Sequence, residues 1–319
     1  MKIWKRFLAS LLALSLLCCF GTTVYAYETV DTEREVSLTV YFGKDGNGFS
    51  GVEFRVYRVA EMSAGAQFIL AGDFADYPVK VNGLDSSGWR ALAQTLDGYA
   101  ARDDLAPLRT VETGNDGKAV FNRLDTGLYL VTGDRYRQGR YTYTPEPFLI
   151  ALPTLNEADA WVYDVTASCK YDSDYNPPGD GGDKEPIDRK VLKVWKDDGN
   201  EEKRPDEIIV QLLRDGDVYD TVTLSERNNW KHTWNDLDED HVWRVVEYDT
   251  PEGYTVTVDR QGITFVMTNS QTEEIPDEPP PTGPVLPHTG MLWWPVPVLA
   301  CAGLFLFLIG WRKRHHAER

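Results

Sequence analysis

Apolar and polar residues alternate in short runs along most of the chain, with the period of two that is typical of half-buried β-strands. Residues 35–42 and 52–59 are the clearest of these runs, and residues 44–48, which favour a turn, lie between them. The segment 86–101 breaks the pattern, because its apolar residues recur at helical spacing and Asp85 or Ser86 is placed to cap a helix. The chain is therefore predicted to be mainly β, with one inserted helix.

Two β-rich regions are separated by a stretch that cannot build a core. Residues 27–170 and 190–270 hold the predicted strands, whereas residues 171–189 are rich in Asp, Pro and Gly and predict a flexible acidic linker. Residues 271–285 contain a run of prolines behind acidic residues, which predicts an extended polyproline spacer. We therefore expect two β-rich domains in tandem, with the inserted helix in the first.

Each end of the chain carries an apolar run beside basic residues. Residues 1–26 begin with basic residues, continue with an apolar stretch and end in small residues, as a secretory signal peptide does. Residues 291–311 form an apolar run long enough to cross a bilayer core, and the basic tail 312–319 is expected to stay in the cytoplasm. These patterns predict an exported protein with a C-terminal transmembrane helix.

The pentapeptide Leu286, Pro287, His288, Thr289 and Gly290 lies directly before this apolar run. Pro287 keeps it out of a helix, and an extended segment is what a protease-like cleft binds. The pentapeptide, the apolar run and the basic tail together resemble the cell-wall sorting signal of Gram-positive surface proteins. The resemblance implies that a sortase, a membrane-bound cysteine transpeptidase, cleaves after Thr289 and joins its carboxyl group to an amine of the wall or of another subunit. The alternative is a permanent single-span anchor.

The end of the first domain has the frame of a known motif. Trp161, Val165 and Lys170 fit the spacing of W-x-x-x-V-x-V-Y-P-K, whereas the three residues before Lys170 depart from it. Together with the strand at 127–131, this ending makes the first domain similar to the N-terminal domain of sortase-assembled pilins. The resemblance implies that Lys170 is the amine to which the next subunit is joined. The alternative is a solvated lysine at the end of a strand.

The second domain is the most recognisable part of the chain. Its segments 193–200, 208–216, 243–247 and 263–269 follow one another along nearly its whole length. In this order they resemble a Cna B-type domain, a small immunoglobulin-like β-sandwich, and many members of that family carry a self-made Lys–Asn isopeptide bond. The two resemblances imply two Ig-like (Cna B-type) β-sandwich domains in tandem.

Strand parity places three polar residues inside the second domain. Lys193, Glu247 and Asn269 each share a face of their strand with its bulkiest apolar residues. Burial lowers the pKa of a lysine towards a neutral, nucleophilic amine and raises the pKa of a glutamate towards a protonated donor. We expect protonated Glu247 to hydrogen-bond the Asn269 carbonyl while Lys193 attacks it and releases ammonia. The alternative is a Lys–Glu ion pair beside an asparagine. The strands of the first domain offer no such set, so that domain should lack the bond.

Charge and cysteine content narrow the class of protein. The whole chain carries a net charge of −17, which becomes −23 once residues 1–26 and those after Thr289 are removed, since seven basic residues and one acidic residue leave with them. Such a surface repels nucleic acid and anionic membranes. Of the four cysteines only Cys169 then remains, so no internal disulfide forms and an unpaired surface thiol is expected.

No pattern favours an enzyme that acts on other molecules. The five histidines form no zinc-binding motif and flank no nucleophile motif, and no phosphate-binding glycine loop is present, so no metal or cofactor is expected. The leading hypothesis is a cell-wall structural protein of a Gram-positive bacterium, a sortase-assembled pilus subunit. Its partners would be a sortase and either a peptidoglycan cross-bridge or other pilin subunits. The alternative is a monomeric wall-anchored adhesin of the MSCRAMM type whose first domain binds a host or matrix ligand; a surface hydrolase is a third hypothesis.

Overall fold

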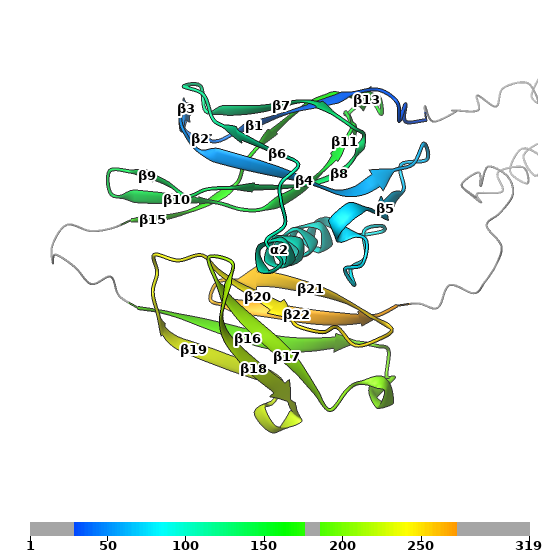
Figure 1. The fold of residues 1–319 in the computed structure, drawn as a ribbon, viewed down its shortest axis with the longest axis vertical. Helices are drawn as coiled ribbons and strands as arrows, with labels where there is room; N and C mark the ends of the chain where they lie inside the picture. The colour runs from blue at the N-terminus through cyan, green and yellow to red at the C-terminus, as the bar shows by residue number, and fades with distance from the viewer. Residues whose placement is uncertain (1–28, 176–185, 273–319) are drawn as a thin grey trace, which may run out of the picture. The chain divides into compact units, whose positions relative to one another are not determined.

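The computed structural model describes residues 29–175 and 186–272. In the first range the alternating segments form the strands of a sandwich, and helix α2 (Ser86–Arg102) is inserted between two of them (Figure 1). The strands are β1 (Val36–Tyr41), β2 (Gly43–Lys44), β3 (Asn47–Gly48), β4 (Glu53–Met62), β5 (Phe68–Leu70), β6 (Arg109–Glu112), β7 (Lys118–Leu124), β8 (Gly127–Gly133), β9 (Tyr136–Gln138), β10 (Tyr141–Pro145), β11 (Phe148–Leu152), β12 (Thr154–Leu155), β13 (Trp161–Val162), β14 (Asp164–Ser168) and β15 (Tyr171–Tyr175).

Two sheets enclose the core of the first domain. One has the strand order β14-β1-β7, with β1 parallel to β14. The other has the order β11-β8-β4, and both β5 and β6 pair with β4. Aromatic rings fill the space between the sheets, among them the fully buried Phe42, Phe54 and Phe121. The mainly β class predicted from the alternating sequence is confirmed.

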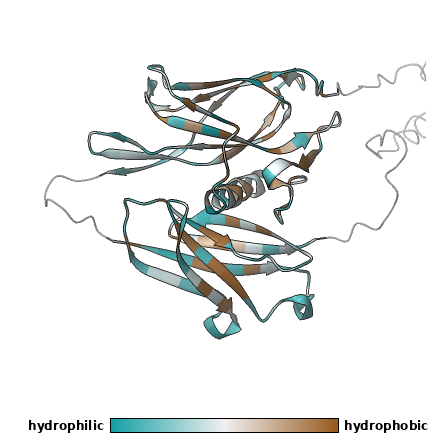
Figure 2. Ribbon diagram, viewed as in Figure 1, coloured by the Kyte–Doolittle hydropathy of each residue, from teal (hydrophilic) through white to brown (hydrophobic). Residues whose placement is uncertain are grey.

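The second domain is a sandwich of a four-stranded and a three-stranded sheet. Its strands are β16 (Ile187–Lys196), β17 (Glu207–Arg214), β18 (Asp217–Ser225), β19 (Lys231–Leu237), β20 (Trp243–Glu247), β21 (Tyr254–Gln261) and β22 (Thr264–Gln271). The sheet orders are β19-β16-β22-β21 and β18-β17-β20. Hydrophobic and hydrophilic residues alternate along these strands, as Figure 2 shows. The first and last strands, β16 and β22, are parallel neighbours, which brings residues far apart in the sequence side by side.

The linker predicted over residues 171–189 is shorter than the sequence indicates. Tyr171–Tyr175 forms β15, which pairs with β10, so the first domain extends to residue 175. The strand forms because the Tyr171 ring packs edge-on against Phe42 and Tyr143, at centroid distances of 5.7 Å and 5.4 Å. In the second described range β16 begins at Ile187, before the predicted domain start.

Several predicted segments lie outside the described residues. They are the signal peptide (1–26), the middle of the linker (176–185), the spacer from residue 273, the pentapeptide (286–290), the transmembrane helix (291–311) and the tail (312–319). Within the two described ranges, no helix has the length and apolar character needed to cross a membrane.

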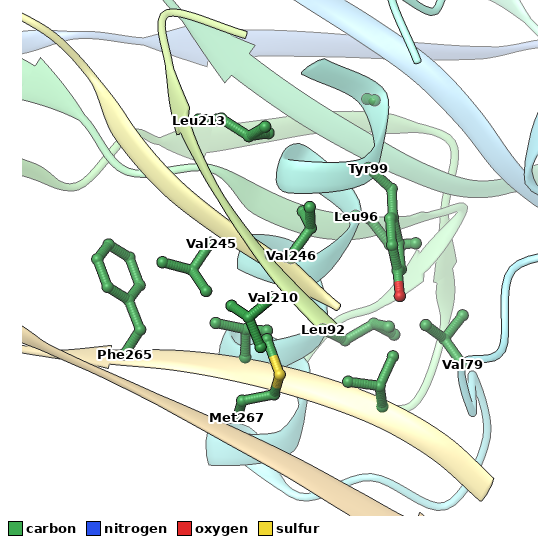
Figure 3. Close-up of a cluster of buried hydrophobic side chains, with 14 of the residues drawn as sticks. Val79, Leu92, Leu96, Tyr99, Val210, Leu213, Val245, Val246, Phe265 and Met267 are labelled. Carbon is green, nitrogen blue, oxygen red and sulfur yellow. The ribbon is translucent and has the colours of Figure 1, made fainter. Parts of the chain in front are cut away.

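Helix α2 begins where the sequence predicts, because the Asp85 side chain accepts a hydrogen bond from Gly88 N at 2.7 Å. Its apolar face packs against its own sandwich, and α2 contacts the edge strand β11 there. That face packs on the outer side of β8, against Leu128 and Leu130, in a core that it shares with the second domain. Figure 3 shows the helical residues beside side chains of β17, β20 and β22. An apolar helical face requires an apolar partner, but the spacing does not identify which one.

Candidate functional site

Lys193 is buried in the second sandwich from the middle of β16. It is 4% exposed, on the face that strand parity predicts, and the neighbouring inward residue Val191 is fully buried. Its Nζ lies 4.6 Å from the centroid of the Trp195 ring. Burial lowers the pKa of Lys193 to about 8, although the charge of Glu247 opposes the shift. An amine with this pKa is a better nucleophile near neutral pH than a surface lysine.

Glu247 is the acidic group that faces Lys193. It ends β20 and is 1% exposed, and its Oε1 lies 2.8 Å from Lys193 Nζ. Its other oxygen, Oε2, accepts a hydrogen bond from Thr250 Oγ1 at 3.1 Å. Since both side chains of the pair are shielded from solvent, a proton can pass from Nζ to Oε1 and leave a neutral amine and a carboxylic acid. Strand periodicity does not identify Thr250, and its position three residues after Glu247 is the available signal in the sequence.

Asn269 completes the cluster from β22 and is fully buried. Its Nδ2 donates a hydrogen bond to Glu247 Oε1 at 3.0 Å, while its Oδ1 has no partner in the described ranges. The parallel register sets Trp195 of β16 opposite Asn269 of β22. Lys193 is two residues before Trp195, so it lies on the same face of β16. Amide nitrogen and oxygen occupy similar volumes. Rotation of the amide by half a turn would therefore bring Oδ1 to Oε1, where protonated Glu247 can donate to it.

The cluster holds the three parts of one acyl transfer: a nucleophile, an acid and an amide electrophile. Attack of Nζ on the Asn269 Cγ would form a new amide bond, break the bond from Cγ to Nδ2 and release ammonia with the proton from Nζ. The same contacts also describe an ion pair with a hydrogen-bonded asparagine.

The first domain presents different residues at the matching places. Phe42, directly after β1, is fully buried, and Lys44 lies at the surface with its Nζ 5.3 Å from the centroid of the Tyr141 ring. A side chain at Gly133 would meet the Phe54 ring, 2.6 Å from an added Cβ atom. A glutamate at that position is therefore sterically excluded.

Lys170, the predicted acceptor, is exposed between β14 and β15. Its carbonyl oxygen accepts a hydrogen bond from Glu146 N at 2.8 Å. This bond fixes the backbone of Lys170 and does not involve its side chain. It lines a cavity of about 1090 Å³ together with charged residues that include Asp97 and Arg244. An exposed amine beside a recess is accessible to another macromolecule.

Cys169 is buried, so the expected surface thiol is wrong. The residue is 7% exposed, and its backbone N donates a hydrogen bond to Tyr41 O at 2.8 Å, beside β1. Cys169 and Lys170 lie between β14 and β15, where Cys169 turns inward and Lys170 turns outward. Burial raises the pKa of the Cys169 thiol to about 12, which makes it unreactive.

Comparison with known proteins assigns each domain separately. Residues 23–167 match the family model of the Gram-positive pilin subunit D1, N-terminal domain, and residues 189–270 match the Cna protein B-type domain. A collagen adhesin from Staphylococcus aureus is 40% identical over 97 residues, which are 28% of this chain and 8% of the adhesin. The chain thus spans a small part of that relative.

Solved structures that match the chain include a B repeat unit and a pilin. The single B repeat unit (B1) of the collagen-binding surface protein of Staphylococcus aureus is 21% identical, with a TM-score of 0.27, covering 75% of this chain and 98% of that one. The full-length major pilin SpaD from Corynebacterium diphtheriae is 15% identical, with a TM-score of 0.28. The match covers 76% of this chain and 99% of that pilin. The family models thus find the chain similar to the Gram-positive pilin D1 family over residues 23–167 and to the Cna B-type domain family over residues 189–270.

Proposed function

We propose that this protein is a structural protein of the Gram-positive cell surface, a sortase-assembled pilus subunit attached through Thr289. The observation that carries the proposal is the exposed Lys170 at the end of a domain that matches the pilin D1 family. The LPHTG sequence at 286–290 supplies the other half of a subunit linkage. Both domain families are structural pilin or adhesin domains, which supports a structural role over an enzymatic one.

The linkage would be one transpeptidation. A sortase thiol attacks the Thr289 carbonyl and releases Gly290 with the transmembrane segment, and Lys170 Nζ of the next subunit then displaces the thiol and forms an amide. At the base of the fibre the amine of a peptidoglycan cross-bridge would take the place of Lys170. Because this lysine is exposed, no rearrangement of the first domain is needed before the reaction.

The second domain would add mechanical strength through an isopeptide bond between Lys193 and Asn269. The strands that carry them, β16 and β22, are the first and last of the domain and lie side by side. A force on the two ends of the domain would then load a covalent bond instead of the hydrogen bonds between these strands. Glu247 would act as the acid in forming the bond.

An immunoblot of enzymatically released cell wall, boiled in SDS, tests the proposal. We expect a ladder of high-mass species that disappears when the sortase is deleted and when Lys170 is changed to arginine, which keeps the charge but cannot accept the acyl group. The control is Lys118→Arg, at an exposed lysine of β7, which should leave the ladder unchanged. A ladder that persists in the Lys170→Arg strain would show that another amine is the acceptor.

The alternative is a monomeric wall-anchored adhesin, and the identity with the collagen adhesin favours it. The first domain also exposes the rings of Tyr141 and Tyr175, whose centroids lie 5.0 Å apart, as an adhesive surface would. In that case the immunoblot gives a narrow band near the monomer mass. Binding of the wild-type cells to matrix proteins, compared with a Tyr141→Ser strain, would then test the adhesin role.

A further inference from the structure

Strands β9, β10 and β15 form a three-stranded ribbon that extends from one end of the first sandwich (Figure 1). Its five tyrosines share one face, since residues directly opposite each other on antiparallel strands point to the same side. The register pairs Tyr141 with Tyr175 and Tyr143 with Tyr136. Tyr171 lies opposite the residue two positions after Tyr143, and therefore points the same way. These five residues are called the tyrosine face.

The base of the tyrosine face is anchored in the core, and its tip is open. Tyr143 is 3% exposed, and its ring centroid lies 4.6 Å from that of Phe49. At the tip, Tyr141 and Tyr175 are 42% and 52% exposed, with ring centroids 5.0 Å apart. The exposed Lys44 places its Nζ 5.3 Å from the centroid of the Tyr141 ring. The tip therefore presents two rings together with hydroxyl and ammonium groups that can donate hydrogen bonds.

The opposite face of the ribbon contacts the second domain. Arg137 of β9 pairs with Asp240 at 2.8 Å, and Asp172 of β15 pairs with Arg260. The tip of the tyrosine face is instead turned to solvent. Rigid aromatic rings with a polar end are typical of surfaces that bind another chain.

The proline-rich segment before Thr289 has the chemistry that suits such a surface. In the polyproline conformation that its composition predicts, there are three residues per turn, so Pro281, Pro284 and Pro287 recur on one side. Prolines lack an N–H and this conformation has no internal hydrogen bonds, so the carbonyl groups accept hydrogen bonds from donors of a binding surface. Grooves lined by aromatic residues bind segments with prolines at this spacing.

The proposed subunit linkage would bring this segment to the ribbon. Lys170 directly precedes the edge strand β15, and Tyr175 ends that strand about 17 Å further along. Pro284 and Pro281 are five and eight residues before Thr289, which is about 16 and 25 Å in a polyproline helix. Lys170 lines the cavity on the other side of β15, so its long side chain and Thr289 would span the strand edge. The tip of the tyrosine face thus falls between the positions that the two prolines would reach.

We propose that the tyrosine face is the docking surface for the proline-rich segment 279–287 of a second copy of this chain, the subunit whose Thr289 is joined to Lys170. This inference rests on the proposed subunit linkage. The rings of Tyr141 and Tyr175 pack against the prolines, and their hydroxyl groups donate hydrogen bonds to the carbonyl groups of the segment. Docking along β15 holds Thr289 near Lys170 and sets the direction in which one subunit follows the next.

Fluorescence anisotropy with a labelled synthetic peptide of residues 279–289 tests the surface. The receptor is the full chain carrying Pro281→Ala and Pro284→Ala, so that its own segment does not compete with the peptide. Adding Tyr141→Ser and Tyr175→Ser to the receptor should weaken binding about tenfold, because aromatic anchors dominate such interfaces. Circular dichroism verifies that each receptor is folded.

The peptide provides the matched control. In the peptide, Pro281→Ala with Pro284→Ala alters the side that recurs every three residues and should also weaken binding about tenfold. Pro279→Ala with Pro280→Ala removes two prolines from the other sides, and this peptide should bind like the unchanged one. Equal losses from the two peptides would overturn the proposed contact, because binding would then depend on proline content alone.

The outcomes separate this inference from the proposed function. A ladder in the immunoblot of wild-type cells, with a peptide that fails to bind or binds equally well to the tyrosine variant, overturns the docking surface and leaves the subunit linkage intact. Loss of matrix binding in Tyr141→Ser cells, with peptide binding independent of the tyrosines, assigns the rings to a host ligand and also overturns the docking surface. Absence of a ladder in wild-type cells overturns both.

Discussion

Lys193 Nζ lies 2.8 Å from Glu247 Oε1, and one proton shared by the two groups would set the pH dependence of the proposed isopeptide formation. The ion pair and the reactive neutral pair hold the same proton, so their exchange does not involve solvent. The rate should therefore be constant from neutral pH up to the Lys193 pKa of about 8. Above this pKa the pair loses its proton and with it the acid, and the rate should fall about tenfold per pH unit. Refolding at a series of pH values, with mass spectrometry for ammonia loss, measures this profile.

A rate that continues to rise above this pKa would contradict the prediction. It would mean that deprotonation of Lys193 limits the reaction and that Glu247 is not needed as an acid. Glu247→Gln provides the control, since it retains hydrogen bonding but has no proton to transfer, and it should show little reaction at any pH.

The inward position of this cluster could be predicted because strand geometry leaves a residue only two faces. Lys193, Glu247 and Asn269 share parity with large apolar residues, and all three are buried. Thr250 could not be predicted in the same way. It lies in a loop after β20, where no period applies.

At the level of elements, the docking of α2 depends on a charged pair at its centre. Asp97 on α2 and Arg244 on β20 form two hydrogen bonds, at 2.5 Å and 3.1 Å, and Asp97 is 9% exposed. Asp97→Ala would leave the guanidinium of Arg244 largely desolvated and without this partner, which should lower the free energy of unfolding by about 2 kcal/mol. Urea denaturation measures the change. In an Arg244→Met background, Asp97→Ala should lower the free energy of unfolding by much less. An equal decrease in both backgrounds would show that Asp97 and Arg244 are not coupled.

The start of α2 could be predicted from its apolar spacing and its cap, whereas its partner could not. The composition of β15 favours a linker, because Asp172 and Asp174 are prominent in it. In the structure the tyrosines at its two ends contact other rings, and the intervening polar residues are tolerated on a ribbon that remains partly exposed. Contacts between segments distant in sequence decide such cases, and they are not encoded in local composition.

Across the whole molecule, one buried cluster runs from the sheet of the first domain through α2 into the second sandwich. A bond from Lys193 to Asn269 would close a loop of about 77 residues, which should stabilise the fold by about 4 kcal/mol through the entropy of the unfolded chain. Asn269→Ala removes the bond and retains the Lys193–Glu247 pair. Because the two domains share a core, loss of the Lys193–Asn269 bond should lower the melting temperature of both domains in calorimetry. The control Lys118→Ala, at an exposed position, should leave both melting temperatures unchanged. If the first domain melts unchanged in the Asn269→Ala protein, the two domains unfold independently, and α2 transmits no stability between them.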